Sequence, residues 1–222
     1  MNTGADKHLT AVRHQVEADA RQQRFGHAGA VVWLTGLSAS GKSTLAMGLE
    51  RALLAQGYAC YTLDGDNLRH GLNADLGFSP ADRAENIRRV GEVAALFADA
   101  GLICITAFIS PYRADRALAR AAAQRSRFHE VYVAADLATC EGRDPKGLYR
   151  KARSGQLPDF TGIDAPYEAP LAAELTLESG QEMLEDSLER LVRYVQTQLP
   201  RAVAHGFDPE TPMDAGRVRI FV

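Results

Sequence analysis

A glycine-rich stretch near the start of the chain carries residues that can bind the phosphates of a nucleotide. Residues 36–43 (GLSASGKS) match G-x-x-x-x-G-K-[ST] at every fixed position. The glycines allow a tight curl whose N–H groups face one anion, Lys42 supplies positive charge for the β- and γ-phosphates, and Ser43 offers a hydroxyl to Mg²⁺. The apolar run 31–34 precedes the loop and residues 44–54 follow with helical spacing. Strand, loop and helix together predict a phosphate-binding site.

Two aspartates at the end of the next apolar run are candidates for the second half of a phosphoryl-transfer site. Residues 58–63 (YACYTL) are typical of a buried strand, and Asp64-Gly65-Asp66 follows at once. The glycine allows the two carboxylates to face different ways, one toward an acceptor hydroxyl and the other toward the shell of Mg²⁺. The alternative is an Asx turn that only caps the next helix.

A phosphate-binding loop predicts a bound nucleotide and leaves the reaction open. GTP switch proteins normally carry an N-K-x-D guanine motif, which this sequence lacks. Motor ATPases need a larger chain and an arginine from a neighbouring subunit. The class that fits 222 residues is a small P-loop kinase, with an acceptor pocket beside the phosphate loop and a lid above it.

Cationic and aromatic residues in the predicted loops are candidates for holding the acceptor. Arg69, Arg83 and Lys146 are the strongest candidates for binding an anion. Phe78 and Phe160 lie in polar, glycine-containing loops, where they either stack on a purine ring or anchor a small satellite core. Isolated arginines are usually solvated, and this is the interpretation we give to Arg88, Arg89, Arg116 and Arg120.

Strands and helices alternate along the chain and must position these residues. Strands are expected at 31–34, 58–63, 102–108, 130–135 and 175–177, and helices at 44–54, 68–76, 83–100, 115–126, 137–141, 148–153 and 181–199. This alternation predicts an α/β, three-layer P-loop NTPase fold: a parallel sheet with helices on both faces. Ligands of such sheets bind beyond the carboxyl ends of the strands. The charged, Gly- and Pro-rich residues 146–170 are expected to form a lid loop.

Composition limits the partners and the location. The net charge of −3 gives no footprint for nucleic acid or for an anionic membrane. Three scattered cysteines without a C-x-x-C suggest neither a disulfide framework nor a zinc site. No signal peptide and no membrane-spanning run is visible, so we expect a cytoplasmic protein.

We expect three parts along the chain. Residues 1–28 form an N-terminal extension, in which Leu9, Val12 and Val16 have the spacing of a short helix. Residues 29–199 form the kinase domain. Residues 200–222 form a tail, which either adds an edge strand, meets a partner subunit or has no order.

Several blocks of sequence together resemble the adenylyl-sulfate kinase family. The blocks are residues 36–44, 63–67 (LDGDN), 69–72 (RHGL), 75–79 (DLGFS), 82–83 with 85–89 (DR, ENIRR), 108–112 (FISPY), 140–141 with 143–149 (CE, RDPKGLY) and 160–164 (FTGID). The resemblance runs from about residue 29 to residue 177, and it is far more specific than the phosphate loop alone.

The resemblance implies an enzyme of sulfate activation and a role for each matching residue. The family uses MgATP to phosphorylate the 3′-hydroxyl of adenosine 5′-phosphosulfate, giving 3′-phosphoadenylyl sulfate. The implied ATP-binding residues are Gly36, Leu37, Ser38, Ala39, Ser40, Gly41, Lys42, Ser43 and Thr44. The implied acceptor-binding residues are Asp66, Asn67, Arg69, Phe78, Arg83, Asn86, Ile109, Ser110, Lys146, Phe160 and Thr161. The implied catalytic residues are Lys42, Asp64, Asp66 and Ser110, and the implied ligands of Mg²⁺ are Ser43 and Asp66.

Two roles and two partners follow from the resemblance with less support from the residues. The residue matching Ser110 is described in some members as a phosphoserine, although direct in-line transfer between two nucleotides needs no covalent step. Residues 150–153 resemble the lid of the family. As partners the resemblance implies a second copy of the chain, in a homodimer, and ATP sulfurylase. Two alternatives stay open: a nucleotide-binding regulatory module without turnover, and a P-loop kinase for another small acceptor.

Overall fold

The sheet is parallel, and the strand that leads into the phosphate loop lies at its centre. The computed structural model describes residues 15–123 and 127–202, and within them the sheet has five strands in the order β2-β3-β1-β4-β5. The strands are β1 (Ala30–Thr35), β2 (Cys60–Asp64), β3 (Ile103–Ala107), β4 (Arg127–Val133) and β5 (Leu175–Leu177). Every neighbouring pair is parallel, so each connection crosses back over one face of the sheet.

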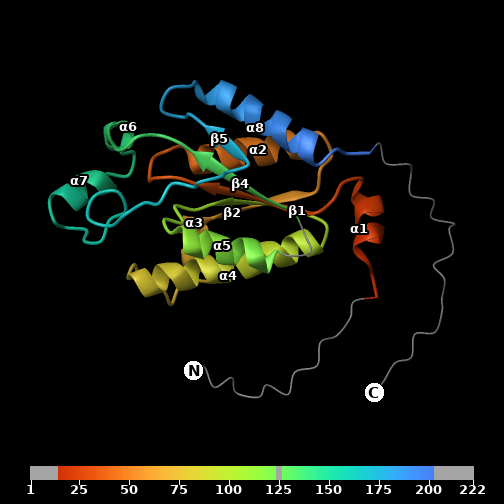
Figure 1. Cartoon of the computed structure of the whole chain (residues 1–222), viewed down its shortest axis with the longest axis horizontal. Helices are drawn as coiled ribbons and strands as arrows, with labels where there is room; N and C mark the ends of the chain where they lie inside the picture. Colours follow the sequence, from red (N-terminus) through yellow and green to blue (C-terminus); the bar gives the residue numbers. More distant parts are fainter. Residues whose placement is uncertain (1–14, 124–126, 203–222) are drawn as a thin grey trace, which may run out of the picture.

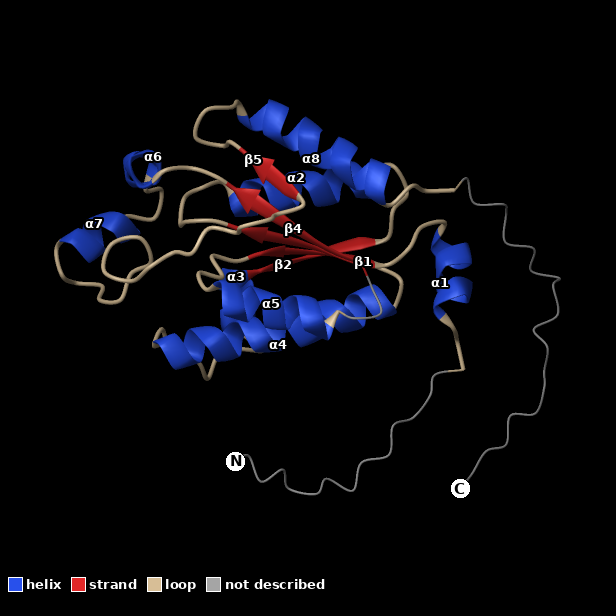
Figure 2. Ribbon diagram, in the orientation of Figure 1, coloured by secondary structure: helices blue, strands red, loops and turns tan. Residues whose placement is uncertain are grey.

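Helices cover both faces of the sheet (Figure 1, Figure 2). They are α1 (Ala18–Phe25), α2 (Lys42–Ala55), α3 (Gly65–Arg69), α4 (Pro80–Asp99), α5 (Arg113–Ala122), α6 (Leu137–Arg143), α7 (Leu148–Arg153) and α8 (Leu184–Gln198). Figure 1 shows α2 and α8 on one face and α4 and α5 on the other. Helices α6 and α7 lie beyond the carboxyl ends of the strands, and α1 lies at the opposite end.

Alternate residues of β1 pack into two cores, one on each face. All six residues of β1 are buried. Val32 and Leu34 share a core with side chains of α2 and α8, including Leu49, whereas Val31 and Trp33 share a core with side chains of α4 and α5. This is the period of two that a strand imposes. Burying each large apolar side chain contributes about 1.5–3 kcal/mol, so β1 holds the loop that follows it in a fixed place.

The predicted fold class is confirmed, and one predicted helix is wrong. The sequence suggested a short helix at residues 68–76, but α3 begins at Gly65 and ends at Arg69, with turns after it. The helix starts early because a carboxylate oxygen of Asp64 accepts a hydrogen bond from the Asp66 N–H, which caps its first turn.

Several predicted boundaries also move by a few residues, including those of the fourth strand and of the helix after the third strand. The fourth strand was expected at 130–135, but β4 begins at Arg127, where it pairs with Ala30 of β1, and ends at Val133. The helix expected at 115–126 is α5, which begins two residues earlier and ends at Ala122. Residues 124–126 lie outside the described residues.

The predictions for the two ends of the chain lie mostly outside the described residues. Of the three residues with helical spacing, only Val16 is described, and it is exposed and precedes α1. Leu9 and Val12 lie outside, as does the tail from residue 203 onward.

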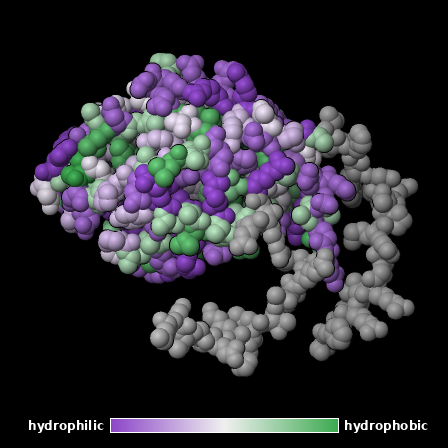
Figure 3. Space-filling model, viewed as in Figure 1, coloured by the Kyte–Doolittle hydropathy of each residue, from purple (hydrophilic) through white to green (hydrophobic). Residues whose placement is uncertain are grey.

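The described surface is mainly polar in the view of Figure 3, where hydrophobic residues occur in small groups among hydrophilic ones. Within residues 15–123 and 127–202, no helix has both the length and the apolar character needed to cross a bilayer.

Candidate active site

The carboxyl ends of β1, β2 and β3 bring three loops together, as the sequence predicted. Ala107 of β3 is paired in register with Leu34 of β1 on one side and with Asp64 of β2 on the other. The phosphate loop follows β1, and residues 108–112 follow β3. The candidate active site therefore lies at this edge of the sheet.

Two positions of the phosphate loop require glycine for different reasons. A Cβ at Gly36 would lie 2.5 Å from the carbonyl oxygen of Val133, so the close approach of β4 excludes a side chain there. Gly41 is the N-cap of α2 and has a φ of 104°, which L residues with a side chain rarely adopt. Thr44 is exposed on the first turn of α2, whose free N–H groups complete the anion site.

Lys42 is held inside the phosphate loop. Its side chain is buried, and Nζ donates to the carbonyl oxygen of Leu37 at 2.6 Å and to Oγ of Ser40 at 3.4 Å. Burial lowers the pKa of Lys42 to about 8. A phosphate group would favour the charged form and offset this cost of burial.

Side chains from outside the loop hold its backbone, and the sequence analysis missed them. The hydroxyl of Tyr149 donates to the carbonyl oxygen of Ser38 at 3.0 Å, and that of Ser179 donates to the carbonyl oxygen of Ser40 at 2.8 Å. Ala39 between them has a φ of 61°. No pattern in the sequence links residues so far apart, because each contact depends on how α7 and the end of β5 fold back over the loop.

Asp64 connects the end of β2 to the phosphate loop. Its Oδ2 accepts a 2.7 Å hydrogen bond from the hydroxyl of Ser43, while Oδ1 accepts the capping bond from the Asp66 N–H at 3.0 Å. The helix cap is therefore confirmed for Oδ1, and the catalytic role of the carboxylate stays a prediction. The carboxylate is largely buried beside Ser43, the predicted ligand of Mg²⁺.

Asp66 pairs with Lys146 of the predicted lid. Both side chains are exposed, by 65% and 61% respectively, so the pair contributes little to stability. Asn67, the next residue of α3, is exposed as well. These side chains are accessible to a ligand without any unfolding.

Arg83 joins helix α4 to two loops. Its Nη1 donates to Oγ1 of Thr161 at 2.7 Å, Nε donates to the carbonyl oxygen of Phe78 at 2.9 Å, and Nη2 donates to the carbonyl oxygen of Asp159. The structure thus brings together three of the predicted acceptor-binding residues.

Arg69 organises the loop that leads into α4. Its Nη1 donates to the carbonyl oxygens of Leu76 and Gly77, at 3.1 and 2.9 Å, and its guanidinium lies 4.3 Å from the centre of the Phe78 ring. This contact is of the cation–π type. Arg69 and Phe78 therefore form one platform beside Arg83.

The two loop aromatics occupy different environments. Phe78 is 60% exposed, as a ring that stacks on a base must be. Phe160 is only 7% exposed; its ring meets that of Tyr149 edge-on at 5.0 Å, in a satellite core with Cys140. The packing favours the satellite-core interpretation for Phe160, because most of its face is already covered.

Asn86 is buried at the base of the acceptor region. Its Oδ1 accepts a 3.0 Å hydrogen bond from Nδ2 of Asn73, which is itself fully buried. Since the oxygen of Asn86 is occupied, its amide NH₂ group is the part left to donate to a ligand.

Ser110 is 2% exposed and lies in the left-handed region, with a φ of 40°. Its Oγ accepts a 3.1 Å hydrogen bond from Nε1 of Trp33 and donates at 3.0 Å to Oγ1 of Thr35, which in turn donates to the carbonyl oxygen of Ile109 at 2.7 Å. A hydroxyl enclosed in this chain of hydrogen bonds supports the shape of its loop, and its burial does not favour a covalent role.

One arginine interpreted as a solvated residue is buried. Arg116 is 3% exposed and makes an ion pair of 2.6 Å with Glu130. No pattern in the sequence indicated this burial, because Arg116 lies in an alanine- and arginine-rich helix whose charged residues all resemble a solvated face. Arg88, Arg89 and Arg120 keep partly or largely exposed side chains.

Comparisons with known proteins agree with this geometry. Residues 28–178 match the family described as adenylylsulphate kinase. The chain is 56% identical over 189 residues to an adenylyl-sulfate kinase of Bacillus licheniformis, covering 84% of this chain and 96% of the relative. It is 60% identical over 173 residues to an adenylyl-sulfate kinase of Geotalea uraniireducens, covering 78% of this chain and 83% of the relative.

Among solved structures, a Mycobacterium tuberculosis APS kinase in complex with AMPPNP and APS matches with a TM-score of 0.74 and 50% identity, covering 76% of this chain and 98% of the other. The predicted family is therefore confirmed: the chain belongs to the adenylyl-sulfate kinases.

Proposed function

We propose that this chain transfers the γ-phosphoryl group of ATP to the 3′-hydroxyl of adenosine 5′-phosphosulfate, giving ADP and 3′-phosphoadenylyl sulfate. The observation that carries the proposal is the hydrogen bond between Ser43 of the phosphate loop and Asp64 at the end of β2. It joins the phosphate site to a buried carboxylate at the edge of the acceptor region. The relative solved with AMPPNP and APS supports the same pair of nucleotides here.

The phosphate side of the reaction is assigned to the loop and to Lys42. Phosphoryl transfer depends mostly on positioning and on charge stabilisation, because the chemistry needs little from the protein. The N–H groups of residues 36–44 hold the ATP phosphates, and the Lys42 ammonium stabilises charge on the transferring group. Asp64 orients the acceptor hydroxyl in line with the γ-phosphate and takes its proton.

Mg²⁺ is assigned to the same junction. The donors there are a hydroxyl and a carboxylate, the hard oxygen ligands that Mg²⁺ prefers, and Mg²⁺ usually completes its shell with substrate phosphates and water. Ser43 and Asp64 are hydrogen-bonded to each other, so we add Asp64 to Ser43 as a proposed holder of the Mg²⁺ shell. Asp66, the other proposed carboxylate, lies in the first turn of α3. Within residues 15–123 and 127–202, no three His, Cys, Asp or Glu side chains gather into a metal site, which fits a metal that arrives with the nucleotide. When bound, Mg²⁺ neutralises charge on the phosphates.

The acceptor side is assigned to the groups that surround Arg83. The guanidinium groups of Arg69 and Arg83 and the ammonium of Lys146 supply positive charge for the phosphate and sulfate of the acceptor. Phe78 stacks on its adenine. The remaining acceptor residues in this proposal are Asp66, Asn67, Asn86, Ile109, Ser110 and Thr161, and Phe160 supports their loop from the satellite core.

The proposal is tested by mixing the purified chain with MgATP and adenosine 5′-phosphosulfate and following both ADP and the 3′-phosphorylated product. We expect ADP and product in equal amounts, and neither when the acceptor is left out. ADP without product would indicate a different acceptor, to be sought with a panel of nucleosides and sugars. Binding of both nucleotides without turnover would favour the regulatory module, although Lys42, Ser43 and Asp64 are all in place for catalysis.

We extend the proposal to the organisation of the chain and its partners. The matched residues 28–178 support a kinase domain at 29–199, with an extension at 1–28 and a tail at 200–222. We also propose a homodimer, an association with ATP sulfurylase and a cytoplasmic location. Sedimentation velocity of the chain, alone and mixed with ATP sulfurylase, tests both associations, and fractionation of cells tests the location.

A further inference from the structure

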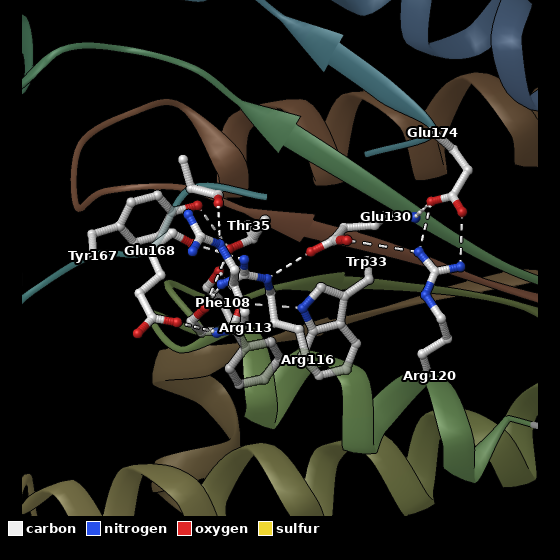
Figure 4. A network of polar contacts seen from close by, with 12 residues as sticks. Trp33, Thr35, Phe108, Arg113, Arg116, Arg120, Glu130, Tyr167, Glu168 and Glu174 are labelled. Atoms are coloured by element: carbon white, nitrogen blue, oxygen red, sulfur yellow. Dashed lines mark hydrogen bonds and ion pairs between the residues drawn. The ribbon is translucent and has the colours of Figure 1, made fainter. Parts of the chain in front are cut away.

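A buried arginine lies behind residues 108–112, the loop after β3, which we call the acceptor loop. It uses all three of its guanidinium nitrogens to hold other parts of the chain. Arg116 donates from Nε to Glu130 at 2.6 Å, from Nη1 to the carbonyl oxygen of Ser110 at 2.7 Å, and from Nη2 to the carbonyl oxygen of Glu168 at 2.8 Å. Figure 4 shows its guanidinium between Glu130, Tyr167 and Glu168. A planar fork with fixed directions suits this task, and a lysine could not reproduce it.

The two carbonyl groups belong to loops that are far apart in the sequence. Ser110 lies in the loop after β3, and Glu168 lies in the segment that leads from Thr161 to β5. Further bonds join the same two loops: the Glu168 N–H donates to the carbonyl oxygen of Pro111, and the Arg113 N–H donates to the Glu168 carboxylate, both at 2.8 Å. The loops therefore form one unit around the Arg116 guanidinium.

This unit is under local backbone strain and needs a fixed support. A residue with a side chain in the left-handed region, such as Ser110, is strained and persists only when its surroundings hold it there. Arg116 holds the carbonyl group of that residue from one side. The hydroxyl of Tyr167 approaches Oγ1 of Thr35 at 3.0 Å from the other, next to the Ser110 hydroxyl.

The phosphate loop is supported by other residues. Tyr149 and Ser179 bond its carbonyl groups, and neither contacts Arg116 through any described hydrogen bond in residues 15–123 and 127–202. We therefore expect a change at Arg116 to disturb the loop after β3 more than the phosphate loop, which the described hydrogen bonds of the unit approach only at Thr35.

We infer that Arg116 is a positioning residue for the acceptor nucleotide: by holding Ser110 and Glu168 together, it sets the affinity for adenosine 5′-phosphosulfate without setting the affinity for ATP. The inference rests on the proposed function, because it concerns the same acceptor site. The Arg116 side chain is only 3% exposed, so it acts through the carbonyl groups that it holds.

The test compares variants of Arg116 with a matched variant one helical turn later. Arg120 also pairs with Glu130, at 3.7 Å, and with Glu174, at 2.8 Å, but none of its described bonds reaches the carbonyl group of Ser110 or of Glu168. R116K keeps the charge and loses the fork. R116M combined with E130Q removes the pair together, so that no buried charge is left unpaired. R120M is the control.

Calorimetry measures the Kd of each protein for adenosine 5′-phosphosulfate and, separately, for AMPPNP. We expect roughly 10–100-fold weaker binding of the acceptor by R116K and by R116M/E130Q, since a displacement of about 1 Å has effects of this size. Binding of AMPPNP should be unchanged in both, and R120M should bind both ligands as the wild type does.

Two results would overturn the inference: unchanged acceptor binding in the folded double variant, or an equal loss for both ligands, which would indicate general destabilisation. Failure of the proposed function is a different result, because it appears in the wild type. A wild type that binds both nucleotides without transferring phosphate ends the kinase proposal while the comparison of Kd values still decides the role of Arg116. A wild type that does not bind the acceptor at all overturns both.

Discussion

The hydroxyl of Ser43 donates a 2.7 Å hydrogen bond to Oδ2 of Asp64, across the junction between the phosphate loop and the end of β2. The other oxygen of the same carboxylate caps α3. One side chain therefore caps a helix and also bonds Ser43, which we propose as a ligand of Mg²⁺. The two tasks can be separated by experiment, because only one of them needs a negative charge.

We predict that D64N abolishes most turnover and leaves the fold intact. Asparagine is as good an N-cap as aspartate, so the free energy of unfolding should stay close to that of the wild type. Loss of the charge removes the base and weakens the metal shell, and kcat should fall by about 10²–10⁴-fold. D64A should lose about 1 kcal/mol of stability in addition, because the cap is gone.

A matched control for D64N lies on the same pair of elements. Glu50 of α2 accepts a 2.9 Å hydrogen bond from the N–H of Thr62 in β2, so E50Q also replaces a carboxylate that accepts a backbone bond at the junction of α2 and β2. We expect E50Q to keep its turnover. Equal turnover in D64N and E50Q, measured as ADP release, would refute the catalytic role of Asp64.

Lys42 predicts a pH dependence of ATP binding. Its pKa is lowered to about 8, mainly by burial, so the ammonium of the free protein loses its proton as the pH rises through 8. ATP needs the charged form. Below this pH binding requires no proton, whereas above it the affinity should fall and each binding event should take up a proton.

Calorimetry of AMPPNP binding, in two buffers with different heats of ionisation, measures this proton uptake directly. K42A should show none at any pH, and its kcat should fall by at least about 10²–10³-fold, as when one transition-state donor is removed. An affinity of the wild type that stays constant well above pH 8 would contradict the lowered pKa.

Replacing the two loop aromatics by alanine should affect two different quantities: acceptor binding for Phe78 and stability for Phe160. F78A removes an exposed ring and should weaken acceptor binding by about 1–3 kcal/mol, on the scale measured for bases stacked on aromatic side chains. Its melting temperature should hardly change. F160A opens a cavity in the satellite core and should cost about 3–5 kcal/mol of stability. The reverse result, stable F160A with weak acceptor binding, would restore Phe160 to the stacking role.

The fold follows closely from the sequence because its strongest signals are local. Continuous apolar runs predicted all five strands, and the glycine loop placed the site at their carboxyl ends. The error at residues 68–76 is also local. Asp64 caps the first turn, so the helix begins at Gly65. This side-chain cap has more effect on the position of the helix than the weak helical spacing of the residues that follow.

The supporting residues of the site could not be predicted, because their role depends on contacts between distant segments. Arg116 lies six residues from Ser110 and fifty-two from Glu168, and only the folded chain brings the three together. For Phe160 the sequence suggests exposure, and the structure shows a buried ring. Its loop is polar and contains glycine, which suggests exposure, yet α7 covers its ring. Burial of a single side chain in a loop is a property of the whole fold.

His27 couples the N-terminal segment to the sheet in a way that depends on its charge. Its ring is fully buried; Nε2 accepts a 2.9 Å hydrogen bond from the N–H of Ala59, and Nδ1 lies 2.9 Å from the carbonyl oxygen of Ala28. The neutral ring with its proton on Nδ1 satisfies both partners. A second proton on Nε2 would face the N–H of Ala59, so the site accepts only the neutral form.

We predict that this histidine makes the protein less stable in acid. Burial is the main cause that lowers the pKa of His27, so the folded protein resists a proton that the unfolded chain accepts below its ordinary pKa of about 6.5. The unfolded state then binds more protons, and stability falls as the pH drops through that value. His129 acts in the same direction, since burial also lowers its pKa.

Urea unfolding of the wild type, H27Q and H27Q/H129Q across this pH range measures the contribution of each histidine to the loss of stability. Glutamine can accept from the Ala59 N–H without titrating, so H27Q should lose less stability in acid than the wild type, and the double variant less again. Parallel curves for all three proteins would show that neither imidazole sets the acid limit.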